Sequence, residues 1–69
     1  MAERLANRLK ERRVELGLTQ AELAERVGVT RKTVNTVENG VFVPSTLLAL
    51  KLAKALGLAV EELFFISPD

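Results

Sequence analysis

The fold is decided by residues 19–40, which read TQAELAERVGVTRKTVNTVENG. Thr19 stands three residues before Glu22, the spacing of a capping box, in which a hydroxyl and a carboxylate each accept a hydrogen bond from a backbone N–H at a helix start. Thr30 marks a second helix start. Gly28, between the two starts, suits the left-handed conformation that ends a helix. The stretch therefore predicts two short helices joined by a tight turn.

Apolar residues recur on one side of each of these helices. Ala24 is small enough to let the second helix cross close to the first. The apolar side chains expected to close around the crossing are Leu23, Val27, Val29, Val34 and Val37. Once these are buried, the opposite side of the second helix carries only groups that form hydrogen bonds, and no carboxylate. This polar face consists of Lys32, Asn35, Thr36 and Asn39, with Arg31 on its flank.

The polar face suits the major groove of DNA, where Arg or Lys donates to guanine, Asn pairs with adenine and a Thr methyl touches thymine. Arg31 and Lys32 occupy the first two helical positions, where the helix dipole disfavours a cation by about 0.3–1 kcal/mol each. Thr33 stands where a capping carboxylate would be, so the second capping box is half made. An electrostatic penalty at an exposed helix start is typical of a functional site. The alternative is an ordinary solvated surface, which normally carries both signs of charge.

Charge is distributed unevenly along the chain. The net charge is only +1, but residues 1–36 hold eight Lys or Arg against five acids, whereas residues 37–69 hold two against four. If DNA is the partner, the N-terminal half is expected to face it. From charge alone, the alternative is that mixed charges merely solvate the helix faces.

Five helices in a single domain, residues 1–69, are expected to account for the chain. Four glycines are placed to end helices, namely Gly17, Gly28, Gly40 and Gly57. Ser45 is expected to cap the fourth helix, whose apolar stripe comprises Leu48, Leu52, Ala53 and Leu56. The fifth helix is expected over Val60–Phe65, and in the first helix Leu5, Leu9 and Leu16 share one face. The predicted fold class is therefore all-α.

Two charged residues fall on these apolar faces. Arg13 fills the gap eight residues after Leu5, and Glu38 lies four residues after Val34. Each charge alone would be expensive to bury, whereas a bidentate contact would satisfy both. We therefore expect a salt bridge between Arg13 and Glu38 that ties the first helix to the third. The alternative is that each side chain reaches solvent separately.

The composition excludes several classes of protein. The chain contains no Cys, His, Tyr or Trp, so disulfides and the usual catalytic bases and nucleophiles are missing. No apolar run has the length of a membrane span or a signal peptide. We expect a soluble, cytoplasmic protein that is not an enzyme, with no cofactor, metal, small-molecule ligand or membrane partner.

Several short motifs, in the right order, resemble the Cro/repressor (Xre-type) helix-turn-helix family over nearly the whole chain. They are Leu18–Ala24, Val27–Thr30, Glu38–Gly40, Pro44–Ser45 and Ala55–Leu58. The resemblance implies a compact, lambda-repressor-like fold with the helix-turn-helix at Thr19–Glu38. It also implies sequence-specific binding of double-stranded DNA by a small transcriptional regulator, which we expect to be a repressor.

The resemblance implies a set of site residues as well. Base edges would be addressed by Arg31, Lys32, Thr33, Asn35 and Thr36. Phosphates would be contacted by Thr19, Gln20, Asn39 and Arg13, and the Arg13 and Glu38 pair matches the buried ion pair of the family. Members of the family bind palindromic sites as two-fold dimers, which places their recognition helices about 34 Å apart.

The chain departs from the family after Gly40, where relatives often offer polar side chains to the DNA backbone. It has Val41, Phe42 and Val43 there, so phosphate contacts from this loop are in doubt. Phe42 is expected to plug the core under the fourth helix rather than form an exposed contact. The candidates for a homodimer interface are Phe64, Phe65 and Ile66, through packing of the fifth helix or pairing of the last residues as strands about a two-fold axis.

A second function is compatible with the same sequence. An antitoxin-like or adaptor protein could keep this fold and work mainly through its apolar end. Such a protein-interaction module would bind DNA weakly and without sequence preference, which distinguishes it from a sequence-specific regulator.

Overall fold

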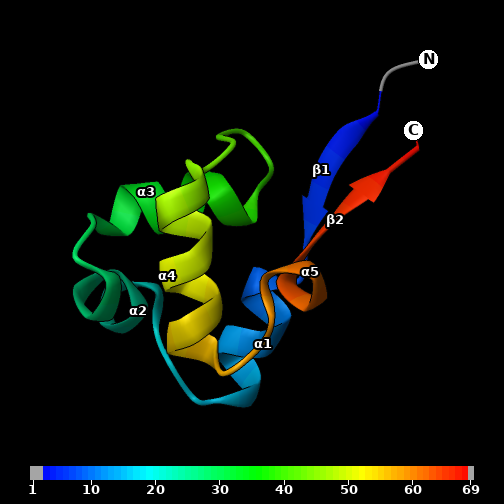
Figure 1. The fold of residues 1–69 in the computed structure, drawn as a ribbon. Coiled ribbons are helices and arrows are strands. Elements are labelled where there is room, and N and C mark those ends of the chain that lie inside the picture. The colour runs from blue at the N-terminus through cyan, green and yellow to red at the C-terminus, as the bar shows by residue number, and fades with distance from the viewer. Residues whose placement is uncertain (1–2, 69) are drawn as a thin grey trace.

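Residues 3–68, the part of the chain that the computed structural model describes, form five helices and a two-stranded sheet (Figure 1). In chain order the elements are β1 (Arg4–Asn7), α1 (Leu9–Glu15), α2 (Gln20–Val27), α3 (Arg31–Glu38), α4 (Thr46–Leu56), α5 (Val60–Leu63) and β2 (Phe64–Ser67). Helix α4 lies at the centre and contacts both α2 and α5, while α3 packs on α2 and also contacts α1. The two strands pair beside the helices, and both ends of the described chain lie there.

The predicted helix starts are confirmed by their capping hydrogen bonds. The Thr19 hydroxyl accepts from the Glu22 N–H at 3.0 Å, and the Glu22 carboxylate accepts from the Thr19 N–H at 2.8 Å. At α3 the Thr30 hydroxyl accepts from the Thr33 N–H at 3.2 Å. The Ser45 hydroxyl accepts in the same way at the start of α4, at 3.1 Å. Three of the five helices therefore begin where local chemistry places them.

The helix ends also follow the sequence. All four glycines come directly after helices or their last turns and have left-handed φ values between 70° and 77°. At Gly28 this conformation turns the chain, so that the Val29 N–H reaches back to the Ala24 carbonyl at 3.0 Å. The longest helix, α4, has only 11 residues. Within residues 3–68, no helix is both long and apolar enough to cross a membrane.

The core lies between the helices and draws on all five of them. Its most deeply buried side chains are Leu9, Leu23, Val34, Val37, Leu52, Leu56 and Leu63. Full burial of such a side chain contributes about 1.5–3 kcal/mol relative to exposure. Two of the seven, Val34 and Val37, belong to α3, so the same packing that stabilises the domain fixes how α3 is rotated about its axis.

The five predicted helices are present, and a small sheet at the two ends of the described chain adds to the mainly helical fold. Strands β1 and β2 pair antiparallel, with Leu5 opposite Ile66 and Asn7 opposite Phe64. The first helix begins only at Leu9, where the Asn7 side-chain oxygen accepts from the Leu9 N–H at 3.0 Å. Leu5 therefore belongs to a strand. Its spacing of four residues from Leu9 is that of two residues on one face of a helix, which is why it was predicted to be helical. Likewise, the fifth helix ends at Leu63 and the expected helical residues that follow are extended.

Three apolar side chains are not where the sequence predicted them. Leu16, expected in the core, comes after the end of α1 and is 44% exposed. Phe42, expected under α4, is 48% exposed and adjoins Leu5 and Phe64 instead. Phe64, a candidate for a dimer interface, is only 7% exposed because it packs into the core of its own chain. The last residues already pair with this chain's N-terminal strand rather than remaining unpaired.

Candidate nucleic-acid interface

The two sides of α3 differ sharply in exposure. Val34 and Val37 are each 1% exposed, and Glu38 is turned toward α1. The exposed side chains are Arg31, Lys32, Asn35 and the following residue Asn39, with Thr33 and Thr36 half-buried beside them. Burial at three-residue spacing thus directs the remaining residues outward. The outward side has donors for hydrogen bonds and two cations, and it lacks any carboxylate.

The two threonines of α3 use their hydroxyls within the helix. The Thr36 hydroxyl donates to the carbonyls of Lys32 and Thr33, each at 3.0 Å. The Thr33 hydroxyl lies 3.0 Å from that of Thr30, the N-cap residue. Because both hydroxyls already form hydrogen bonds within the protein, the methyl groups are the part of these side chains best suited to contact a base.

The two asparagines lie one helical turn apart at the C-terminal half of α3. The Asn39 side-chain amide donates to the Asn35 side-chain oxygen at 3.3 Å. Their spacing of four residues puts both on the same side as Lys32. The side chain of Asn has both a donor and an acceptor, so it can pair with the edge of adenine in the major groove. Asn35 is the better placed of the two for such a contact, because it lies within α3 whereas Asn39 is the C-cap residue.

The start of α2 lies next to this surface. Gln20, the first residue of α2, lines one shallow hollow together with Arg31, Lys32 and Asn35. Thr19 precedes it as the exposed N-cap residue of α2. The structure therefore brings one residue predicted to contact phosphate alongside three predicted to contact bases. Two cations stand at the start of α3, whose first turn contains no acid, so this side of the molecule attracts anions.

The predicted ion pair between Arg13 and Glu38 is present and almost buried. The Arg13 Nε donates to one Glu38 carboxylate oxygen at 2.6 Å and Nη2 donates to the other at 3.3 Å. The remaining guanidinium nitrogen, Nη1, donates to the Leu18 carbonyl at 2.8 Å. The side chains are 11% and 3% exposed. A buried pair with this many hydrogen bonds holds α1 against the last turn of α3.

This geometry withdraws Arg13 from the predicted phosphate contacts. All three of its guanidinium nitrogens donate to acceptors within the protein, and the residue is buried. Gln20 also joins the pair, because its side-chain amide donates to Glu38 at 3.0 Å. Arg13 therefore acts through Glu38 and Gln20, by fixing where the start of α2 lies relative to α3.

The capping carboxylate of α2 stays ionised near neutral pH. The hydrogen bond from the Thr19 backbone N–H lowers the pKa of Glu22, and the Thr19 side chain and the charge of Arg26 act in the same direction. A negative charge in the first turn suits the dipole of α2. It also occupies the Thr19 N–H, so a phosphate approaching here must use the Gln20 side chain or the remaining N–H groups of the first turn.

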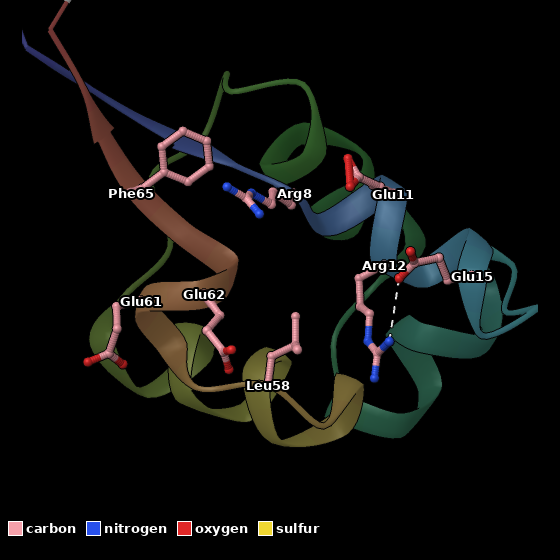
Figure 2. Close-up of a pocket in the computed structure, with 8 residues that line it drawn as sticks. All are labelled: Arg8, Glu11, Arg12, Glu15, Leu58, Glu61, Glu62 and Phe65. Carbon is pink, nitrogen blue, oxygen red and sulfur yellow. Dashed lines mark hydrogen bonds and ion pairs between the residues drawn. The ribbon is translucent and has the colours of Figure 1, made fainter.

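The hollow shown in Figure 2 lies away from this surface, between α1, α5 and β2. It is lined by residues of both charges: Arg8, Glu11, Arg12, Glu15, Leu58, Glu61, Glu62 and Phe65. Several of these already have partners. The Arg8 guanidinium stacks 5.3 Å from the Phe65 ring centre, and Arg12 bonds to Glu15 and to the Leu56 carbonyl. Among residues 3–68, no three His, Cys, Asp or Glu side chains are grouped to hold a metal.

Two contacts near α3 were not predicted from the sequence. The Asn7 side-chain amide donates to the Val37 carbonyl at 2.9 Å, which ties β1 to the last turn of α3. The other is the bond between Gln20 and Glu38. Asn7, two residues before Leu9, is a residue type that often marks the start of a helix. Its bond to the Val37 carbonyl joins residues thirty positions apart, so nothing in the nearby sequence predicts it. Gln20 carried no local sign of its contact either.

The chain is similar to known helix-turn-helix proteins over most of its length. It matches the helix-turn-helix family model HTH_3 over residues 9–63. An uncharacterized HTH-type transcriptional regulator of Methanothermobacter thermautotrophicus is 52% identical over 62 residues, which cover 88% of this chain and 90% of the relative. A regulator of the same description from Bacillus subtilis is 45% identical over 65 residues, with coverage of 94% and 98%.

Solved structures give the same result. The restriction-modification controller protein C.AhdI from Aeromonas hydrophila aligns with a TM-score of 0.76 at 42% identity, over 80% of this chain and 83% of that one. The biofilm regulator SinR, solved in complex with DNA, aligns with a TM-score of 0.73 at 31% identity, over 78% of this chain and 87% of that one. The chain therefore belongs to the Xre-type (Cro/C1-type) family of helix-turn-helix proteins, which are DNA-binding transcriptional regulators rather than enzymes.

Proposed function

We propose that this protein binds specific sites in double-stranded DNA by inserting α3 into the major groove, and that it regulates transcription as a repressor. The observation that carries the proposal is the asymmetry of α3. Its valines are 1% exposed, whereas its cations and amides are exposed and no carboxylate lies among them. A repressor role follows most directly, because a protein seated on a promoter excludes polymerase without any further contact.

Base readout is assigned to the first six residues of α3, Val34 excepted. Arg31 and Lys32 would donate to guanine, and Asn35 would pair with adenine. Thr33 and Thr36 would contact thymine through their methyl groups, since their hydroxyls bond within the helix. Lys32, Asn35 and Thr36 are supported by their place on the outward side of α3, with Arg31 on its flank, whereas Thr33 is supported by the family resemblance alone.

Phosphate contacts are assigned to Thr19, Gln20 and Asn39, which lie at the ends of α2 and α3. Such contacts would set the register of the protein on the duplex without reading its sequence. Gln20 is the best supported of the three, because it lies with Arg31 and Lys32 around one hollow and is held by Glu38. Binding as a homodimer to a palindromic operator completes the proposal, with two copies of α3 about one DNA turn apart.

The test is selection of the preferred duplex from a random pool, followed by measurement of its affinity against scrambled duplexes at two salt concentrations. We expect a specificity ratio of about 10³ or more together with a marked salt dependence. Equal affinity for selected and scrambled duplexes would refute sequence-specific binding.

Two lysines give a matched comparison in that assay. Lys32→Ala should weaken binding to the selected site by about 1–3 kcal/mol and relax base preference at one position. Lys54→Ala removes another exposed cation, on α4 rather than α3, and should change the affinity much less. Gln20→Ala should weaken binding to selected and scrambled duplexes alike. A similar loss from Lys32→Ala on all sequences would show that Lys32 contacts phosphate rather than bases.

A protein-interaction module remains the second candidate, and a specific observation favours it. Several large apolar side chains outside α3 are exposed, most of them between α3 and the middle of α4. If these served an unrelated protein and DNA binding were incidental, the selection would yield no preferred sequence.

A further inference from the structure

The surface that follows α3 is apolar over an unusual length. Residues 41–50 read VFVPSTLLAL and contain no charged residue. Five of their side chains are between 48% and 78% exposed; we call Val41, Phe42, Val43, Leu47 and Leu50 the apolar patch. The patch comprises the loop between α3 and α4 and the first turns of α4.

The patch is fixed to the fold rather than carried on a loose loop. The backbone N–H groups of Val41 and Phe42 both donate to the Thr36 carbonyl, at 3.0 and 3.2 Å. Phe42 and Val43 adjoin Leu5 of β1. Leu5 in turn pairs with Ile66, which is 67% exposed on β2. The apolar surface therefore continues from the loop onto the sheet, and the start of the loop is hydrogen-bonded to α3.

On α4 the patch occupies the side that faces away from the core. Leu47 and Leu50 lie on the outer stripe that continues as Lys51 and Lys54, while Leu52 and Leu56 face inward. The outer stripe of α4 is thus apolar in its first half and cationic in its second. The outer stripes of α4 from two copies of the chain could pack at their apolar halves, with the lysines of the two copies at opposite ends of the contact.

We propose, on the basis of the proposed function, that the apolar patch is the interface at which a second copy of this chain binds. The patch and Ile66 together expose about 600 Å², at roughly 100 Å² for each side chain, which approaches the ~800 Å² that each partner contributes to a standard interface. A patch without charge can meet its own image across a two-fold axis without repulsion. It lies at the upper end of the roughly 300–600 Å² that the largest apolar patch of a monomer ordinarily exposes.

The position of the patch favours a second copy over an unrelated partner. The patch begins directly after Gly40, at the C-terminal end of α3, whereas Arg31 and Lys32 stand at the opposite end. A copy seated there leaves the cationic end of each α3 uncovered and holds the two helices at a fixed separation. This arrangement is what two half-sites one DNA turn apart require. It replaces Phe64 as an interface residue, since Phe64 is buried, and it does not use Phe65, which is 39% exposed but lies beside Arg8 on the opposite face of β2 from Ile66.

The experiment is sedimentation equilibrium of the full chain, without DNA, from about 1 to 200 μM. We expect the unmodified protein to form dimers with a Kd of about 10 μM or lower. Leu47→Glu and Val43→Glu should each raise that Kd by about 100-fold or more, because each places two carboxylates in one apolar interface. Val14→Glu is the matched control, since Val14 is 59% exposed on α1 and lies outside the patch. Circular dichroism should report unchanged helix content in all three variants.

The possible outcomes separate this inference from the proposed function. A protein that stays monomeric at 200 μM, or patch variants that dimerise as the unmodified protein does, would overturn the inference and assign the patch to a different partner. In either case α3 can still be tested on a single half-site. Monomeric Leu47→Glu should retain its base preference there while losing the tighter binding to the full palindrome. If the unmodified protein shows no base preference on the half-site, the proposal that α3 recognises bases would be refuted instead.

Discussion

At the scale of single residues, Glu38 helps to position the surface that we propose faces DNA, although its own side chain is almost buried. It accepts hydrogen bonds from Arg13 and from Gln20, and its side chain is 3% exposed. These bonds join the end of α3 to α1 and to the start of α2. A residue that no DNA would touch therefore fixes the positions of residues that we expect to touch it.

Removing the charge of Glu38 should destabilise the protein strongly. Glu38→Gln leaves the Arg13 guanidinium almost buried and without a counter-charge, so we expect the free energy of unfolding to fall by about 3–5 kcal/mol. Urea denaturation followed by circular dichroism measures this loss.

The matched control is Glu15→Gln, which breaks the exposed pair between Arg12 and Glu15. That pair lies at 3.4 Å with side chains 30% and 59% exposed, so its loss should cost under about 1 kcal/mol. Equal effects of the two substitutions would mean that the Arg13 and Glu38 pair contributes no more than a surface contact.

At the scale of secondary structure, α2 and α3 differ in how their first turns are capped: α2 has a complete capping box and α3 has half of one. Helix α2 has both hydrogen bonds of the box, through Thr19 and Glu22. Helix α3 has the hydroxyl half from Thr30, but Thr33 replaces the carboxylate and two cations occupy its first turn. The start of α3 is therefore weaker than local chemistry would allow, and it is the end that we propose enters the groove.

Completing the second box should separate stability from DNA binding. Thr33→Glu supplies the missing carboxylate and favours the α3 dipole, so the free energy of unfolding should rise by about 0.3–1.5 kcal/mol. The same charge would face phosphates and bases, and we expect affinity for the selected duplex to fall by at least about tenfold. Thermal unfolding and fluorescence anisotropy measure the two effects. A variant that is more stable and binds as before would remove Thr33 from the interface.

The limits of prediction from the sequence also become clear at this scale. The starts of α2, α3 and α4 depend on residues three positions apart, so they could be read locally, and so could the outward face of α3. The sheet could not, because β1 and β2 are four residues each and pair across almost the whole chain. Leu5 lies at helical spacing from Leu9, so the first helix was predicted to start too early. The ion pair between Arg13 and Glu38 is a long-range contact that could be predicted, because two opposite charges on apolar faces can be buried together only if they pair.

At the scale of the whole molecule, Asn7 connects three parts of the fold. It ends β1, its side-chain oxygen accepts from the Leu9 N–H at the start of α1, and its amide donates to the Val37 carbonyl in α3. These bonds connect the sheet to α1 and α3. Movement of the sheet relative to α3 would break one of these bonds.

Asn7→Ala should loosen this connection. Two backbone groups lose their side-chain partner, and we expect the free energy of unfolding to fall by about 1–3 kcal/mol. Hydrogen exchange of the amides paired between β1 and β2 should also become faster, which a purely local loss at α1 would not cause. Asn35→Ala, at an exposed position, should change the stability by less than about 0.5 kcal/mol. Unchanged exchange in the strands would show that Asn7 serves α1 alone.

The pairing of β1 with β2 has a further consequence for engineering. Because Arg4 lies directly opposite Ser67, the two ends of the described chain can be bridged by a short peptide linker. Backbone cyclisation at this point, or circular permutation with new termini in another loop, should leave the helices undisturbed. A fluorophore or fused domain attached next to Arg4 or next to Ser67 would lie at the same place on the molecule.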